Sequence, residues 1–293
     1  MSSLFLSTAP GTTLHIRVSR PSTPIGKPLI VFLHYWGGSS STWYKLTSTD
    51  SQTSIANKYP TAAVDLRGWG KSTGPVYDPG SAYSVTAMAA DTASVLSRLE
   101  TDADYNDFLA HGFILVGHSM GAKVALATLS VLPAHLLERL KGLVLVAPAP
   151  PTALELPGEM KEQQRAAYET QSSVRWTVEN ILARVDRLSQ KDLECLVHDS
   201  LAGNDLSKAA WPLYGMREDI SNLVSKTIRG KGIRVRILAG ELDVVEPQER
   251  VQVEVCQYLK ELGANVSFRI VEGVKHLIPL EMPQAVRDEI SIF

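Results

Sequence analysis

The sequence predicts an α/β protein with a mostly parallel eight-stranded sheet and helices on both faces. Six near-continuous apolar runs are typical of strands that are buried on both sides. Stretches with helical spacing alternate with these runs, which favours parallel strands joined by helices. One stretch, residues 151–211, has no strand-like run and predicts a helical insertion after the sixth strand. A chain of 293 residues is long enough for such a domain.

The expected strands are short and rich in β-branched and other apolar residues. The N-terminal segments "LFLST" and "TLHIRV" predict an antiparallel hairpin at the sheet edge. The six apolar runs supply the other strands: "PLIVFLH" (28–34), "TAAVD" (61–65), "FILVG" (113–117), "GLVLVA" (142–147), "IRVRILAG" (233–240) and "VSFRIVEG" (266–273).

Three stretches between these strands have helical spacing and suitable ends. They cover residues 84–100, 120–132 and 246–263. Ser84 is a capping residue for the first, and Pro133 and Gly263 end the other two.

The helical insertion predicts a lid. It reads as three helices, over 155–171, 173–188 and 190–203. An insertion at this point is expected above the carboxyl ends of the strands, where open α/β sheets bind ligands. We therefore expect a core of residues 1–150 and 213–293 and a lid of residues 151–212, the alternative being a helical decoration away from the site.

Composition excludes several classes of function. The net charge of −2 leaves no basic face for nucleic acid. No apolar window is long enough to span a membrane, and the N-terminal residues lack the leading charge of a secretory signal, so a cytoplasmic location is expected. Cys195 and Cys256 predict two free thiols. No histidine or cysteine cluster has metal-ligand spacing, so neither metal nor cofactor is expected.

The segment Gly117-His118-Ser119-Met120-Gly121 carries the strongest chemical signal. It fits the G-x-S-x-G elbow, with an apolar strand before it and an amphipathic helix after it. A nucleophile on so sharp a turn needs neighbours without a Cβ atom. The following helix directs backbone N–H groups at any oxyanion formed there. Ser119 is therefore the predicted nucleophile.

A serine nucleophile needs a base and a carboxylate that orients it. His276 follows the last expected strand, whereas His198 lies inside the insertion and His135 lies on or just beyond the helix of the elbow. We expect His276 to be the base. The loop "ELDVVEP" supplies the acid, for which Asp243 is the choice and Glu241 the fallback.

Four segments taken together resemble the α/β-hydrolase superfamily, in its branch of small, cap-bearing serine esterases. They are "HYWGGS" (34–39), "DLRGWGKS" (65–72), "GHSMG" (117–121), and the pair "GELDVVEP" and "GVKHLIPLEMP". The resemblance implies the α/β-hydrolase fold. It also implies an oxyanion hole formed by the backbone N–H groups of Trp36 and Met120. Tyr35 stands where the family usually has glycine, which leaves open whether Tyr35 or Trp36 supplies the second donor.

The resemblance further implies acyl transfer through Ser119, and hydrogen-bonding roles in the loops for His34, Asp65 and Arg67. Haloalkane dehalogenases and epoxide hydrolases of this fold carry aspartate at the nucleophile, so Ser119 excludes a carboxylate-ester intermediate.

The substrate is less constrained by the sequence. Tyr35, Trp176 and Trp211 are candidates for an apolar pocket between core and lid. We expect a small or medium apolar carboxylic ester or lactone as the substrate, and a monomer or small homo-oligomer. The alternatives are a hydrolase of carbon–carbon bonds in diketones with the same triad, and a ligand-binding receptor of the same fold.

Overall fold

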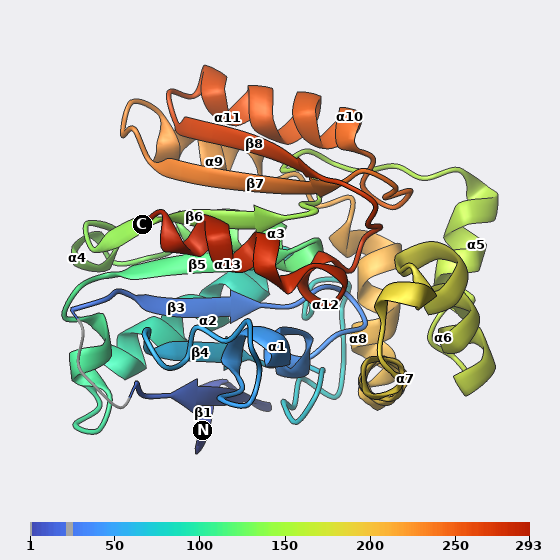
Figure 1. The fold of residues 1–293 in the computed structure, drawn as a ribbon, viewed down its shortest axis with the longest axis horizontal. Coiled ribbons are helices and arrows are strands. Elements are labelled where there is room, and N and C mark those ends of the chain that lie inside the picture. Colours follow the sequence, from blue (N-terminus) through green and yellow to red (C-terminus); the bar gives the residue numbers. More distant parts are fainter. Residues whose placement is uncertain (1, 22–25) are drawn as a thin grey trace.

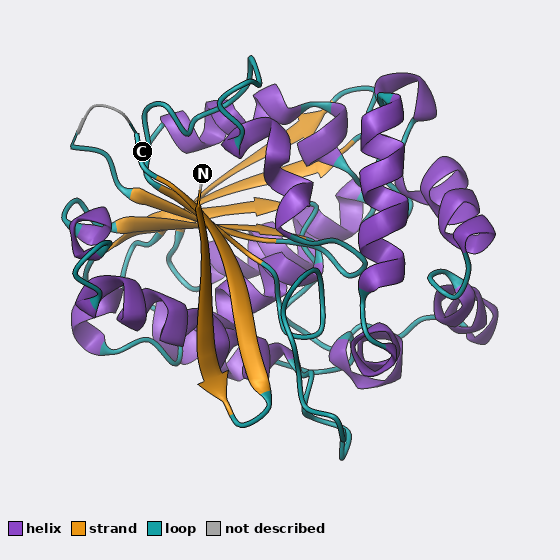
Figure 2. Cartoon of the chain, turned by 90° about the horizontal axis from the view of Figure 1, so that it is seen from below, coloured by secondary structure: helices purple, strands orange, loops and turns teal. Residues whose placement is uncertain are grey.

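The computed structural model describes residues 2–21 and 26–293, and these form one twisted eight-stranded sheet with helices on both faces (Figures 1 and 2). The strand order is β1-β2-β4-β3-β5-β6-β7-β8. The bounds are β1 Ser2–Ala9, β2 Thr12–Ser19, β3 Leu29–Leu33, β4 Thr61–Val64, β5 Phe113–His118, β6 Leu140–Val146, β7 Arg234–Gly240 and β8 Asn265–Val271.

The strand directions agree with the prediction. Strands β3 to β8 pair in parallel, whereas β1 pairs antiparallel with β2 and β2 antiparallel with β4. All six apolar runs are therefore confirmed as strands, as is the N-terminal edge hairpin. Strand β8, at the sheet edge, is not buried on both sides as expected: only Val271 in it is buried. Because the central strands β3, β4 and β5 are almost wholly buried, their continuous apolar sequences are needed to cover both faces of the sheet.

Helices cover each face of the sheet over a separate hydrophobic cluster. One cluster includes side chains of α2 (Val85–Thr101), α3 (Met120–Thr128), α9 (Ser221–Ile228) and α11 (Tyr258–Glu261). The other includes side chains of α1 (Tyr44–Thr47), α12 (Ile278–Glu281) and α13 (Pro283–Ser291). The short helices α4 (Ala134–Leu137) and α10 (Gln248–Arg250) complete the α-helices outside the central insertion.

The insertion between β6 and β7 projects beyond the carboxyl ends of the strands (Figure 1). Its first four helices are α5 (Gly158–Ala166), α6 (Gln171–Thr177), α7 (Gln190–Ala202) and α8 (Asp205–Ala210). We call residues 158–215 the helical segment.

The helical segment differs from the predicted three helices in three places. The predicted helix over 155–171 is shorter, since α5 covers only Gly158–Ala166 and α6 begins at Gln171. The predicted helix over 173–188 ends early: α6 widens into a π-helical turn, Val178–Leu182, and then stops at Ala183, whose backbone is extended. A further helix, α8, begins after Asn204, whose side chain accepts a hydrogen bond from the backbone of Ser207. That cap sits in a stretch too short for helical periodicity to be recognised.

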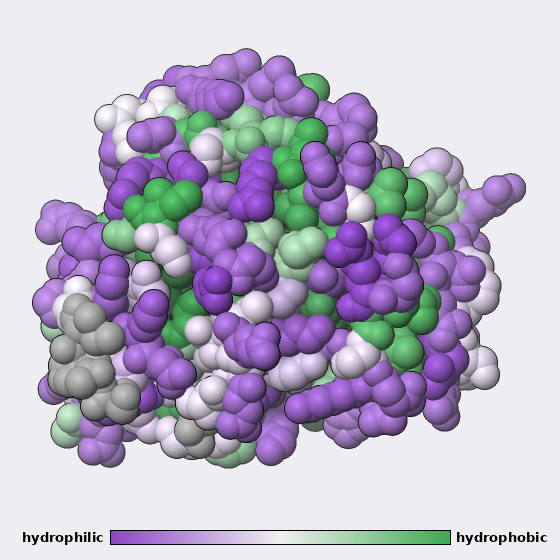
Figure 3. Space-filling view, in the orientation of Figure 1, coloured by the Kyte–Doolittle hydropathy of each residue, from purple (hydrophilic) through white to green (hydrophobic). Residues whose placement is uncertain are grey.

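The surface of the face in Figure 3 is a mosaic of polar and apolar side chains. Among the described residues, no helix is both apolar enough and long enough to cross a lipid bilayer.

Candidate functional site

Ser119 lies on a strained turn between β5 and α3. Its backbone angles, φ 54° and ψ −116°, are unusual for a residue with a side chain. The turn is held by the Ser119 N–H, which donates to the Val146 carbonyl over 2.9 Å. The hydroxyl is thereby presented at the carboxyl end of the central strand.

The two glycines of the elbow are required by close backbone packing. A Cβ atom on Gly117 would lie 2.4 Å from the carbonyl oxygen of Gly121, and one on Gly121 would lie 2.4 Å from that of Leu33. These atoms belong to the backbone of β3 and α3, so they cannot rotate away. The spacing G-x-S-x-G is therefore a packing requirement of the strand–turn–helix unit.

His276 and Asp243 meet at the carboxyl ends of the last strands. The Nδ1 atom of His276 lies 2.8 Å from Oδ2 of Asp243, and both side chains are buried. The second carboxylate oxygen, Oδ1, accepts hydrogen bonds from the backbone N–H groups of Val245 and Glu246. The carboxylate is thus fixed from both sides, which orients the imidazole.

The backbone of His276 is also held by two hydrogen-bonding groups, one in the elbow and one in the helical segment. His118, inside the elbow, donates from Nε2 to the His276 carbonyl over 2.8 Å. The carbonyl of Leu182, in the helical segment, accepts from the N–H groups of both His276 and Leu277. The histidine loop is therefore tied to the elbow and to the helical segment at once.

His34 and His118 are both buried in the neutral form. Burial lowers the pKa of His34 to about 4, and burial together with the adjacent His276 lowers the pKa of His118 well below its ordinary value. His34 donates from Nδ1 to the Tyr35 carbonyl and accepts at Nε2 from the Leu66 N–H. Two satisfied ring nitrogens make it a structural histidine that orders the loop after β3.

Ser119 and His276 line one cavity of about 210 Å³. Its wall is mostly apolar, and the helical segment supplies about half of the lining side chains. The lining includes Tyr35, Trp36, Leu154, Leu156, Met160, Gln163, Gln164, Ala167, Tyr168, Thr177, Ile181, Leu182, Trp211, Met216, Val244, Val245 and Glu246.

The backbone N–H groups of Tyr35, Trp36 and Met120 donate hydrogen bonds to none of the described residues, so this observation does not distinguish Tyr35 from Trp36 as the second donor. Met120 is the first residue of α3, where helical N–H groups lack intrahelical partners. Tyr168 donates from its hydroxyl to the Trp36 carbonyl over 2.9 Å. Its ring also fills the space that a side chain on Gly37 would need. This tyrosine holds the loop after β3, and sequence reasoning did not single it out.

Two of the remaining candidates line the cavity and two do not. Tyr35 and Trp211 line the cavity, but Trp176 does not and is 48% exposed. Helix α6 buries Val174 and Thr177, so Trp176 is left on the outer side. Glu241 is exposed and accepts a hydrogen bond from the backbone of Gly273.

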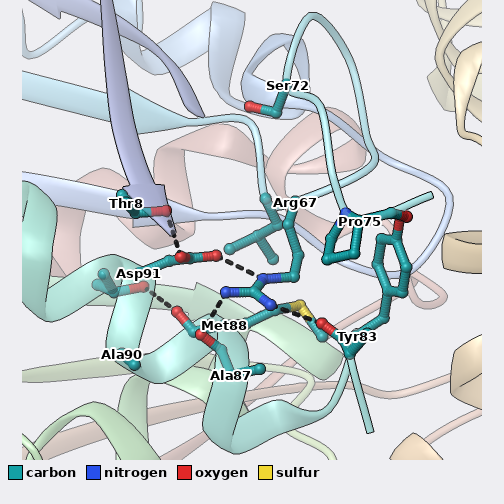
Figure 4. Close-up of polar contacts among 12 residues, drawn as sticks. Thr8, Arg67, Ser72, Pro75, Tyr83, Ala87, Met88, Ala90 and Asp91 are labelled. Carbon is teal, nitrogen blue, oxygen red and sulfur yellow. Dashed lines mark hydrogen bonds and ion pairs between the residues drawn. The ribbon is translucent and has the colours of Figure 1, made fainter. Parts of the chain in front are cut away.

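The loop after β4 has a structural role, as Figure 4 shows for Arg67. Its guanidinium bonds to the Asp91 carboxylate over 2.6 Å and to the carbonyls of Ala82 and Ala87. Asp91 also accepts a hydrogen bond from Thr8 of the edge hairpin. Hydrogen bonds of Arg67 therefore hold this loop against α2, as predicted.

Two buried ionisable side chains near the site were not predicted from the sequence. Lys123 of α3 donates to the carbonyls of Thr152 and Met216, one on each connection of the helical segment to the core. Burial lowers its pKa to about 8. Glu246 lines the cavity, and burial raises its pKa well above the ordinary value. Across the described residues, no three His, Cys, Asp or Glu side chains gather as a metal site requires.

Comparison with known proteins gives one family match. The sequence model described as "Alpha/beta hydrolase family" matches residues 30–289, which spans the sheet from β3 onward and both ends of the helical segment. No curated protein sequence matches the chain significantly.

Solved structures with the same arrangement cover nearly the whole chain at low identity. The esterase RhEst1 from Rhodococcus sp. ECU1013 is 23% identical with a TM-score of 0.74, and 100% of this chain and 98% of that one align. A thermophilic esterase from Thermogutta terrifontis is 20% identical with a TM-score of 0.71, over 100% and 97%. The N-acyl homoserine lactonase AidH is 14% identical with a TM-score of 0.68, over 100% and 95%. At these identities the likeness establishes the fold.

Proposed function

Since the chain belongs to the alpha/beta hydrolase family, we propose that it is a serine hydrolase that cleaves a small or medium apolar carboxylic ester or lactone. Esterases and a lactonase among the structures of the same fold support this class of reaction. The proposed route is acyl transfer through a covalent ester on Ser119.

The observation that carries the proposal is the pairing with Asp243 of His276, which lines the same cavity as Ser119. The 2.8 Å contact between Nδ1 and the carboxylate leaves Nε2 as the ring nitrogen available to accept a proton from a hydroxyl. A cavity lined by both Ser119 and His276 gives an ester carbonyl a place to bind between them.

Each residue then has one role. Ser119 attacks the carbonyl carbon while His276 takes the hydroxyl proton, and His276 returns that proton to the departing alkoxide. Asp243 stabilises the imidazolium. The free N–H groups of Trp36 and Met120 stabilise the oxyanion, and water activated by His276 then releases the acid.

We propose that residues 151–212, which include most of the helical segment, form the lid of this site, and that residues 1–150 and 213–293 form the core. Support comes from the share of the cavity wall that the helical segment supplies, and from the hydrogen bonds that Leu182 accepts from the histidine loop. Lys123 also holds the two connections of the helical segment to the core. Closing the cavity with apolar side chains excludes bulk water from the acyl-enzyme, except for the water that the histidine activates.

A fluorophosphonate probe tests the nucleophile directly. Wild type, Ser119→Ala and the control Ser130→Ala are labelled and the modified peptide is mapped. Ser130 lies just beyond the same helix, and its hydroxyl donates to the Ala127 carbonyl. The proposal expects labelling of wild type and Ser130→Ala on Ser119 and none on Ser119→Ala. The proposal is contradicted if the probe labels another residue, or if folded wild type and folded Ser130→Ala, which both keep Ser119, are not labelled.

Turnover separates the proposed reaction from the two alternatives. Esters with a chromogenic leaving group and a vinylogous diketone are supplied to the same enzyme preparation. A hydrolase of esters releases many equivalents of alcohol per protein from the first and leaves the second intact. Preference for the diketone indicates carbon–carbon cleavage, whereas a single slow turnover with a change of shape indicates a receptor.

A further inference from the structure

The side-chain amide of Gln164 has a hydrogen-bond acceptor that no described residue satisfies, in a cavity wall that is mostly apolar. Gln164 lies on α5 of the helical segment and lines the cavity that contains Ser119. Its Oε1 atom is buried, and among the described residues it has no hydrogen-bond partner. A buried acceptor without a partner costs free energy of folding. A ligand that donates a hydrogen bond to Oε1 would remove this cost.

One other side chain in the cavity wall has a buried polar atom without a partner among the described residues, the hydroxyl of Tyr35. The charge on that phenol would face Tyr168 and Asp199, and burial raises its pKa well above the ordinary value. A hydroxyl can rotate to donate or accept, whereas an amide carbonyl only accepts. Gln164 therefore specifies its partner more narrowly than Tyr35 does.

The orientation of the amide follows from its chemistry. With the NH₂ group turned to the same buried position, two donors would be without partners in place of one acceptor. The carbonyl oxygen therefore occupies the buried position, where a water molecule in the free protein is a suitable partner for it.

We propose that the hydrolysed ester or lactone carries an N–H or O–H donor, such as a secondary amide, and that Gln164 selects it by accepting that hydrogen bond. This inference rests on the proposed function and narrows its substrate class. A substrate with the donor replaces the water with an equivalent bond. A purely apolar substrate of the same shape displaces the water and leaves Oε1 unsatisfied, which lowers its rate.

Matched ester pairs test this selection. In each pair one ester has a secondary amide and the other has a methylene in place of the amide N–H. The donor is placed in the acyl chain or in the alcohol chain, one to three methylenes from the ester. Values of kcat/KM are measured for wild type, Gln164→Met and the control Gln190→Met. Gln190 lies on α7, outside the cavity, and donates to Glu194.

Wild type and Gln190→Met are expected to prefer the amide ester by about tenfold for at least one donor position. Gln164→Met is expected to lose that preference, chiefly by slower hydrolysis of the amide ester. The proposal is overturned if no position gives a preference in wild type, or if Gln164→Met keeps it.

Binding to Ser119→Ala separates this inference from the proposed function. Trp36 and Trp211 line the cavity, so tryptophan fluorescence reports occupancy by the same ester pairs. If wild type hydrolyses no ester but Ser119→Ala binds the amide about tenfold more tightly in a Gln164-dependent way, the proposed reaction is wrong and the selection by Gln164 stands. Equal binding of both esters overturns the selection whatever the activity.

Discussion

The Nε2 atom of His118 donates a hydrogen bond to the backbone carbonyl of His276 over 2.8 Å, and the centroids of the two imidazole rings lie 4.9 Å apart. The residue before the proposed nucleophile therefore positions the loop of the proposed base. A motif position that varies freely in G-x-S-x-G has here a contact 158 residues away along the chain.

Replacing His118 with phenylalanine keeps the ring packing but removes this donor. We expect kcat to fall about tenfold with little change in KM, because a misplaced base slows the chemical step more than substrate binding. His118→Gln, which keeps a side-chain donor, is expected to recover part of the loss. Steady-state kinetics on a chromogenic ester measures both. Equal loss in the two variants would contradict a role for the hydrogen bond.

Tyr168→Phe removes the hydroxyl that donates to the Trp36 carbonyl. We expect kcat to fall about tenfold, because the peptide that presents the proposed oxyanion donor is then held less firmly. Tyr214→Phe is the matched control: that hydroxyl bonds to Asp78, away from the cavity. Steady-state kinetics should show a lower kcat for Tyr168→Phe than for Tyr214→Phe. Equal kcat values would contradict the role of the Tyr168 hydroxyl in holding the Trp36 peptide.

Gly121→Ala tests the packing of the elbow. Its Cβ would lie 2.4 Å from the Leu33 carbonyl, so we expect the free energy of unfolding to fall by about 2 kcal/mol or more. Gly158→Ala, at the first position of α5, meets no atom within 4 Å and should leave stability unchanged or slightly higher. Urea denaturation compares the variants. A Gly121→Ala protein as stable as wild type would be inconsistent with this geometry.

The stability of the protein should depend on His34 in mildly acidic solution. Burial lowers its pKa from 6.5 to about 4, so between these values the unfolded chain binds a proton that the folded chain does not. Its contribution is present above pH 6.5 and is lost as pH falls through that window, by up to about 3 kcal/mol.

Urea denaturation of wild type and His34→Gln across this window measures the contribution. The stability advantage of wild type should shrink as the pH falls from 6.5 to 4. Parallel curves for wild type and His34→Gln would show that His34 does not titrate in this way.

Local pattern was enough to predict the sheet. Strands β3, β4 and β5 were predictable from continuous apolar runs because these strands are buried on both faces of the sheet. Strand β8 lies at the sheet edge and is only partly buried, so its apolar run has a different cause. The meeting of His276 with Asp243 was also predictable, because both follow strands whose carboxyl ends share one edge.

Contacts made by ordinary residues could not be predicted. Gln164 lies on the amphipathic helix α5 and Tyr168 lies in the turn after it, and nothing in the local sequence distinguishes either from a surface residue. The break at Ala183 also depends on tertiary contacts, since the helical spacing continues through it while Leu182 turns its carbonyl to the histidine loop. Trp176 has the large aromatic side chain that is common in apolar pockets, but it lies on the outer side of α6.

The central claim is that the hydroxyl of Ser119 carries the acyl group during turnover. Rapid acid quenching of wild type during hydrolysis of p-nitrophenyl butyrate, followed by peptide mass spectrometry, measures this directly. The account predicts a butyryl group on the peptide that contains Ser119, formed at the rate of p-nitrophenolate release and absent in Ser119→Ala. Hydrolysis at the wild-type rate by Ser119→Ala, or a butyryl group on another residue, would contradict it.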